Sequence, residues 1–229
     1  MFCADDQPCG PFFGDPGYSH IYWHDDSNDV MMMAGSKYGQ RQRRDTMSSN
    51  YITEDDTLYE IYTDDSGAFS VGMICAQNDS DILFAGVDEE GKISAYYALP
   101  RKVILEMCTD TEYLARIRQY MRYAQQHSYA AWFSLPQIDV DPDKPIMSQL
   151  LRMAHKEGEP VTLSRVGDDE ILCGYVRELA GGRVSLDTID PVSADNMPQV
   201  KIKVRDLEYV EYKSLANTLL AFANRELAR

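Results

Sequence analysis

Four residues near the N-terminus have types and a spacing that could bind a metal ion. Cys3, Cys9, His20 and His24 offer two thiolates and two imidazoles, a ligand set found in structural zinc sites. The H-x3-H spacing places both imidazoles on one helical face. However, the gap between Cys3 and Cys9 is wider than usual for zinc ligands. We favour the alternative, that these residues occur by chance in an unstructured leader.

A second candidate is the alternating basic run Lys201, Lys203 and Arg205. Residues at i, i+2 and i+4 of a strand lie on one face, and Arg183 and Arg177 are expected nearby. Such a face could bind an anion, including the phosphates of RNA. The alternative, which we favour, is a charged face that protects an edge strand from pairing with other chains.

The sequence predicts no catalytic residues. It contains no G-x-S-x-G turn and no glycine-rich phosphate loop. Cys75 and Cys173 stand among apolar strand residues, where a thiol behaves as a small hydrophobe. His127 and His155 stand at helix ends, where an imidazolium complements the helix dipole. We therefore expect a protein that is not an enzyme and uses no cofactor.

Composition narrows the class of protein further. The chain has 229 residues, a formal net charge of -15 and a 44% share of hydrophobic residues, which is normal for a globular protein. The acidic balance argues against strong nonspecific binding of nucleic acid. No apolar run is long enough for a membrane span, and no signal peptide is visible. The odd number of cysteines, five, suits reduced thiols, so we expect a cytoplasmic protein.

Four segments are expected along the chain. Residues 1–50 hold prolines and glycines without a lasting period, and Met47 begins a stretch typical of a protein start. We therefore expect a disordered leader or a mis-assigned start. Residues 51–128 predict five strands (58–62, 69–76, 82–87, 93–99 and 103–107) and then a helix. Residues 129–145, rich in proline and aspartate, predict a linker.

The last segment, 146–229, predicts a similar order of elements. A short helix over 146–155 precedes five strands, at 161–166, 171–179, 183–189, 200–204 and 207–212. A closing helix follows Ser214, with an apolar side made of Leu215, Leu219, Leu220 and Phe222.

The two strand-rich segments align with each other. Apolar and turn residues coincide at a spacing of 102 positions, and then of 103 after one loop. The aligned pairs include Gly72 with Gly174, Ile82 with Val184, Asp88 with Asp190, Leu99 with Ile202 and Ile104 with Leu207. Two antiparallel barrels can align by accident, but coincident turn residues favour an internal duplication.

The second copy resembles the Sm-like family of SH3-type barrels. The resemblance rests on its leading helix, its five strands, the G-x-V of Gly174 to Val176, the D-x-x-D-P of Asp187 to Pro191 and the D-L-x-x-V of Asp206 to Val210. It is similar to uncharacterised Gram-positive bacterial proteins with such barrels. The resemblance implies a mainly β fold of two tandem SH3/Sm-like five-stranded barrels, each followed by a helix, forming an intrachain pseudo-dimer.

We expect a non-catalytic interaction module that binds a protein partner or itself, without a membrane. The alternative is a weak RNA-binding regulator. It would use the basic strand of the second barrel, with Lys201, Lys203, Arg205, Arg183 and Arg177. The Arg-Gly pair that RNA-binding Sm proteins carry near the fifth strand is absent from both copies.

Overall fold

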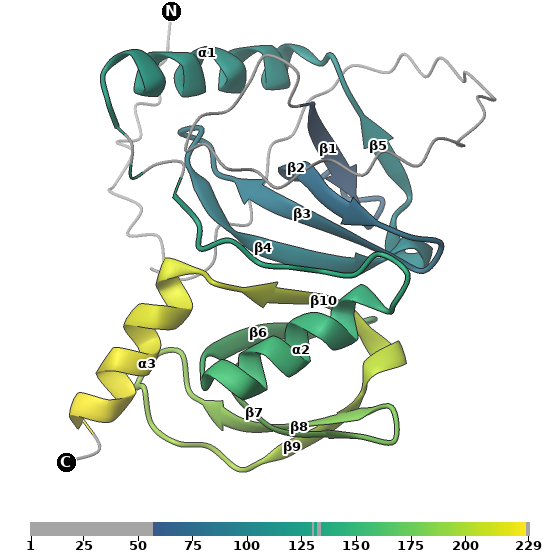
Figure 1. Ribbon diagram of the computed structural model, residues 1–229, viewed down its shortest axis with the longest axis vertical. Coiled ribbons are helices and arrows are strands. Elements are labelled where there is room, and N and C mark those ends of the chain that lie inside the picture. The colour runs from purple at the N-terminus through teal and green to yellow at the C-terminus, as the bar shows by residue number, and fades with distance from the viewer. Residues whose placement is uncertain (1–56, 130, 132–133, 228–229) are drawn as a thin grey trace, which may run out of the picture.

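One antiparallel sheet of ten strands runs through the computed structural model of the protein, which describes residues 57–129, 131 and 134–227 (Figure 1). The first half contributes β1 (Leu58–Tyr62), β2 (Ser70–Gln77), β3 (Asp81–Val87), β4 (Ile93–Pro100) and β5 (Glu106–Cys108). The second half contributes β6 (Pro160–Arg165), β7 (Asp168–Ala180), β8 (Arg183–Ile189), β9 (Val200–Lys203) and β10 (Leu207–Tyr212). The prediction of a mainly β fold is therefore confirmed.

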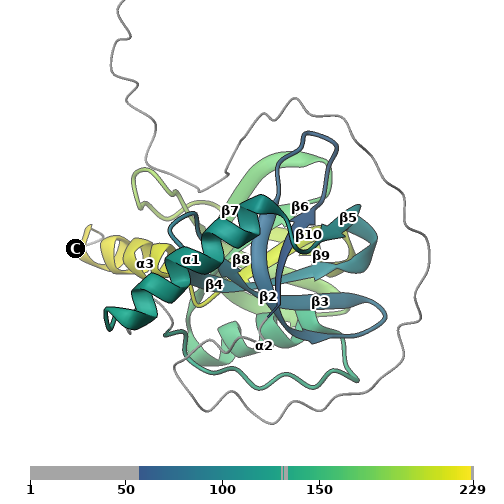
Figure 2. The same cartoon turned by 90° about the horizontal axis from the view of Figure 1, so that it is seen from above.

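The described residues also form three α-helices: α1 (Glu112–Gln126), α2 (Ile146–Glu157) and α3 (Leu215–Leu227). Seen from above, α1 crosses the strands of the first half (Figure 2). Two short 3-10 helices, η1 (Arg101–Val103) and η3 (Val204–Asp206), connect β4 to β5 and β9 to β10. The fifth strand, expected over 103–107, therefore begins later. No helix within the described ranges is long and apolar enough to cross a bilayer.

The two halves share one strand order. The sheet runs β5-β1-β2-β3-β4-β10-β6-β7-β8-β9, so each half reads fifth, first, second, third, fourth. The ladder of β2 with β3 has a bulge between Ile74 and Ala76, and that of β7 with β8 has one between Val176 and Glu178. These bulges are 102 positions apart, which is the spacing of the sequence alignment.

Two glycines occupy matching positions in β2 and β7, where no side chain fits. A Cβ on Gly72 would lie 2.3 Å from a ring carbon of Phe84 and 2.6 Å from Ala85 O. A Cβ on Gly174 would lie 2.2 Å from Asp187 O. Such contacts are far shorter than van der Waals distance. Glycine is therefore required where each second strand passes against its third.

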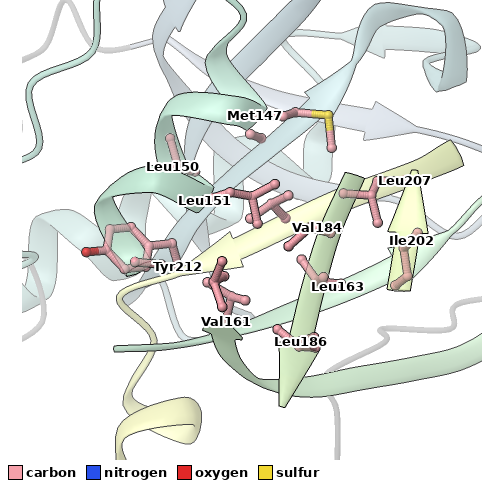
Figure 3. Packing of buried hydrophobic residues seen from close by; sticks show 14 of the residues in the cluster. Met147, Leu150, Leu151, Val161, Leu163, Val184, Leu186, Ile202, Leu207 and Tyr212 are labelled. Atoms are coloured by element: carbon pink, nitrogen blue, oxygen red, sulfur yellow. The ribbon is translucent and has the colours of Figure 1, made fainter. Parts of the chain in front are cut away.

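The halves are joined by backbone pairing and by a shared core. β4 pairs with β10, with Ala98 opposite Val210 and Tyr96 opposite Tyr212. The largest hydrophobic cluster combines α2 and the second-half strands with Leu83 and Ala98 of the first half. Figure 3 shows α2 lying over side chains from β6, β8, β9 and β10. The junction is therefore part of the protein core.

α2 begins on a carboxylate from the other half. The backbone N–H of Ile146 donates to Asp81 Oδ2 at 2.8 Å, and Asp81 is 6% exposed. Asn78 Nδ2 donates to the carbonyls of Pro142 and Lys144. The first backbone N–H groups of a helix lack partners within the helix. Asp81 of the first half therefore supplies a hydrogen-bond acceptor to a helix of the second half. This contact fixes α2 over the junction.

We predict that Gly72→Ala and Gly174→Ala each destabilise the protein by roughly 3 kcal/mol, because the added methyl group overpacks the sheet. Gly167→Ala is the control: its φ is +74° and nothing lies within 4 Å of its Cβ. This substitution should lower the free energy of unfolding by only roughly 1 kcal/mol, the cost of a Cβ in the left-handed conformation. Urea unfolding measures all three, and equal losses in all three would contradict the packing argument.

Candidate functional site

The predicted basic residues gather on the edge of the second half. Lys203 stands opposite Arg183 and Lys201 opposite Ser185 in the β8–β9 ladder. Because directly opposite residues share a face of a sheet, Lys201, Lys203 and Arg183 lie on one face. All three are exposed, and none forms an ion pair with a described carboxylate. We call this surface, extended by Arg177 and Arg205, the basic face.

The other two members of the basic face lie at its margins. Arg177 occupies the bulge of β7, beside Glu178, which stands opposite Ser185. Arg205 lies in η3, and its side chain is 77% exposed with Nε 3.6 Å from Asp206 Oδ1. The basic face therefore contains two acidic neighbours, and its central cations are those of β8 and β9.

The basic face includes an open strand edge. Within the described residues, β9 hydrogen-bonds to β8 alone, and β5, at the other end of the sheet, to β1 alone. Lysines on an edge strand disfavour pairing with a strand from another chain. The sequence interpretation of Lys201 and Lys203 as edge protection is thus compatible with their place in the fold.

A surface that the sequence did not indicate as a binding site lies on α3. Of the apolar side expected for this helix, Leu215, Leu219 and Phe222 face outward and are each 57% exposed, whereas Leu220 is half-buried. We call these three residues the α3 apolar face. A signal for it exists in the sequence, since residues 215–224 contain no charged side chain.

The orientation of α3 follows from two buried asparagines. Asn217 Oδ1 accepts hydrogen bonds from Thr162 Oγ1 at 2.7 Å and from the Cys173 thiol at 3.2 Å. Asn224 Nδ2 donates to Ala194 O at 2.7 Å. Buried polar groups need such partners, so α3 turns its polar side inward and its apolar side to solvent.

The matching helix of the first half has the opposite arrangement. On α1, Leu114, Ile117 and Met121 are buried in a core with β1, β2 and β3. Its outward residues include Glu112 and Arg116. At a spacing of 103 positions these two correspond to Leu215 and Leu219. The α3 apolar face therefore has no counterpart at the matching positions of α1, where the exposed large side chains are instead Tyr120 and Tyr123.

The thiols and imidazoles of the described residues have structural environments. Burial raises the pKa of the Cys173 thiol to about 11. Burial first, and then the neighbouring Glu106, raise the pKa of the Cys108 thiol to about 11. Both thiols are therefore protonated at neutral pH. Nδ1 of His155 lies 2.8 Å from Val176 O, and Nδ1 of His127 lies 2.8 Å from Tyr123 O. Each ring is thus held by a backbone carbonyl.

The candidate zinc ligands Cys3, Cys9, His20 and His24 lie outside the described residues. Among the residues that are described, no group of three or more histidine, cysteine or acidic side chains is placed to hold a metal ion.

Comparison with known proteins gives no family for the chain. No protein-family model, no curated protein and no solved structure matches it. The sequence and the geometry are therefore the basis for the function proposed below.

We predict that Cys173 in the folded protein resists iodoacetamide at pH 8, whereas exposed Cys75 reacts. A thiol with a pKa of about 11 contributes little thiolate at this pH, and burial blocks access, so the rate should be at least roughly a hundredfold lower. Peptide mass spectrometry measures labelling at each site. Labelling in guanidinium is the control, and equal native rates would contradict this environment for Cys173.

Proposed function

We propose that the chain is a non-catalytic interaction module whose halves are tandem Sm-like five-stranded units, each followed by a helix. Four features support the duplication: the common strand order, the matching bulges, the paired glycines and the turn before each following helix. In these turns Asp110 and Lys213, 103 positions apart, have φ of 62° and 63°. Thr111 and Ser214 then accept the N–H of Leu114 and Asn217. A left-handed residue before a hydroxyl cap is an uncommon combination.

One residue of the alignment shifts under this proposal. A spacing of 102 positions would pair Gly91 with Ser193, but the backbone pairs Gly91 with Ala194. Both have positive φ, 83° and 60°, and their N–H groups donate to the carbonyls of Asp88 and Asp190. The extra residue of the second copy therefore lies before Ala194.

The α3 apolar face is the observation that carries the proposed interaction. Three large apolar side chains at i, i+4 and i+7 of one helix form a contiguous stripe. Contiguous exposed apolar surface marks interaction sites more often than scattered apolar residues do. The stripe replaces polar residues at the matching positions of α1, so the fold itself does not require it.

The partner that this face fits best is a second copy of the chain. A two-fold contact places the same surface against itself, and a face without charge avoids like-charge repulsion. Antiparallel α3 helices would bring Leu215 of one copy toward Phe222 of the other, with Leu219 at the centre. The face of one 13-residue helix is small against the roughly 1,200 Å² of a stable interface. We therefore expect a weak, concentration-dependent dimer.

The salt dependence of this dimer is predicted from charge. Two chains of formal net charge -15 repel each other, and salt screens this repulsion while leaving apolar contact intact. Association should therefore strengthen as salt rises. The affinity for RNA should instead fall as salt rises, because salt ions compete with the contacts to phosphate.

We predict that Leu219→Lys weakens the dimer at least roughly tenfold, because a charge enters the centre of the contact. Leu105→Lys is the matched control, since Leu105 is 58% exposed but lies beside β5. Sedimentation equilibrium over a range of concentrations and salt measures both. The proposal would be contradicted if the wild type stayed monomeric at every concentration and salt. Equal effects of the two substitutions would also contradict it.

A second candidate function is weak RNA binding on the basic face. The favouring observation is the register that puts Lys201, Lys203 and Arg183 on one face without described acidic partners. Successive cations on a strand suit the spaced phosphates of a single strand. No Arg-Gly pair supports base recognition, so binding would be weak and dominated by phosphate contacts.

We predict that the double variant Lys201→Gln, Arg183→Gln lowers the slope of log K against log salt by about 1.4, or about 0.7 for each lost phosphate contact. Arg116→Gln is the control, because Arg116 is exposed like Lys201 and Arg183 but lies on α1, outside the basic face. Fluorescence anisotropy with a short single-stranded RNA measures the slopes. Absence of binding at low salt removes this candidate.

A further inference from the structure

A cavity of about 830 Å³, broadly open to solvent, lies where the two halves meet. Its walls come from the β2–β3 loop and η1 of the first half, and from the β7–β8 loop and η3 of the second. The first turn of α2 completes it, with Met147 and Ser148. This volume lies in the range of small-molecule sites, which are roughly 300–1,000 Å³. Neither the α3 apolar face nor an RNA strand on the basic face requires this cavity.

Hydrogen bonds hold the walls of the cavity in place. In each half the 3-10 helix bonds to the loop between the second and third strands: Arg101 N donates to Ser80 O at 2.8 Å and Val204 N to Gly182 O at 2.9 Å. Lys102 Nζ then donates to Arg205 O at 2.6 Å, which joins the two halves directly. The cavity is therefore preformed, as ligand sites usually are.

The cavity contains an electrostatic arrangement that folding alone does not explain. Arg183 and Lys203 stand directly opposite each other in the ladder and both line the cavity. Like charges directly opposite on a sheet are destabilising, and no described carboxylate pairs with either. At the matching positions of the first half, Asp81 stands opposite Pro100. The like-charge pair is thus specific to the second half.

The acidic residues of the cavity form no ion pair with Arg183 or Lys203. Asp81 accepts the N–H of Ile146 and is 6% exposed, so its carboxylate is engaged by α2. Asp79 lies in the exposed β2–β3 loop and forms no ion pair with a described residue. Three further cations, Arg101, Lys102 and Arg205, also line the cavity. The lining therefore carries five basic and two acidic side chains.

We propose that this cavity binds a small molecule that carries a phosphate group. The guanidinium of Arg183 suits bidentate bonding to phosphate oxygens, and Lys203 adds a point charge from the opposite strand. The Ser148 hydroxyl is a further donor on the α2 side. Met147 and Val204 offer apolar contact to the body of the ligand. A bound phosphate would relieve the repulsion between Arg183 and Lys203.

Neighbouring lysines of one strand provide the test. Lys203 lines the cavity and Lys201, two residues earlier on β9, does not. Isothermal titration calorimetry with inorganic pyrophosphate, on the full chain, should give one site in the wild type. Lys203→Gln and Arg183→Gln should each weaken it at least about tenfold, since charge-assisted hydrogen bonds are lost. Lys201→Gln, with the same change of net charge, should stay within about twofold.

A thermal unfolding series provides an independent readout. Without ligand and at low salt, Lys203→Gln should raise the melting temperature, because it removes a like-charge contact. Pyrophosphate should raise the melting temperature of the wild type and of Lys201→Gln by similar amounts, and that of Lys203→Gln by clearly less.

Three results would overturn the proposal. The first is that pyrophosphate fails to saturate the protein at low millimolar concentration. The second is that Lys201→Gln and Lys203→Gln weaken binding equally, which would indicate attraction by surface charge alone. The third is binding of a short single-stranded RNA without binding of pyrophosphate. AMP and adenosine as a matched pair identify the ligand body: AMP binding more tightly than both adenosine and pyrophosphate supports a nucleotide. The dimer of α3 is measured separately, so its failure leaves this test unaffected.

Discussion

The backbone ladder between β4 and β10 is the constraint that sets the two described halves against each other. It converts two five-stranded halves into one sheet and removes two open edges, each of which would otherwise expose unpaired N–H and C=O groups. Side chains reinforce it on both faces. On one face Tyr97 stacks on Phe84 and meets Tyr209 of β10 at 6.1 Å between ring centroids. On the other, Ala98 and Val210 enter the core under α2. The core under α2 is therefore shared by the two halves, whereas the core under α1 is made of first-half residues.

Hydrogen bonds at both ends of α2 hold this helix over the junction. At its start, Asp81 of the first half accepts the Ile146 N–H. At its end, Glu157 accepts hydrogen bonds from Tyr212 at 2.8 Å and Lys213 at 2.5 Å, where β10 leaves the sheet. Lys213 first, and then Tyr212, lower the pKa of the Glu157 carboxyl. These two contacts orient α2, and through Ser148 they also set one wall of the cavity between the halves.

Local signals in the sequence predicted most strands and helices, because alternation, turn residues and caps act over a few positions. A hydroxyl residue before a helix is such a local signal, and Thr111 accepts the Leu114 N–H at the start of α1. Long-range features were not predictable in the same way. The opposition of Arg183 and Lys203 depends on a register between strands twenty positions apart. The outward side of α3 depends on Asn217 meeting Thr162 from β6, since helical periodicity alone places an apolar stripe against a core.

The pattern of differences between the halves separates scaffold from surface. Positions that fix the backbone keep their character: Gly72 and Gly174 leave no room for a side chain, and Asp110 and Lys213 share a left-handed conformation. Positions free of that constraint diverge between the two halves. Its closing helix has Leu219 where α1 has Arg116. Opposed cations likewise stand where the first half has an acid opposite a proline. Opposed like charges cost stability in a sheet, and contiguous exposed apolar surface marks interaction sites more often than scattered apolar residues do, so both proposed binding surfaces lie at positions where the second half departs from the first.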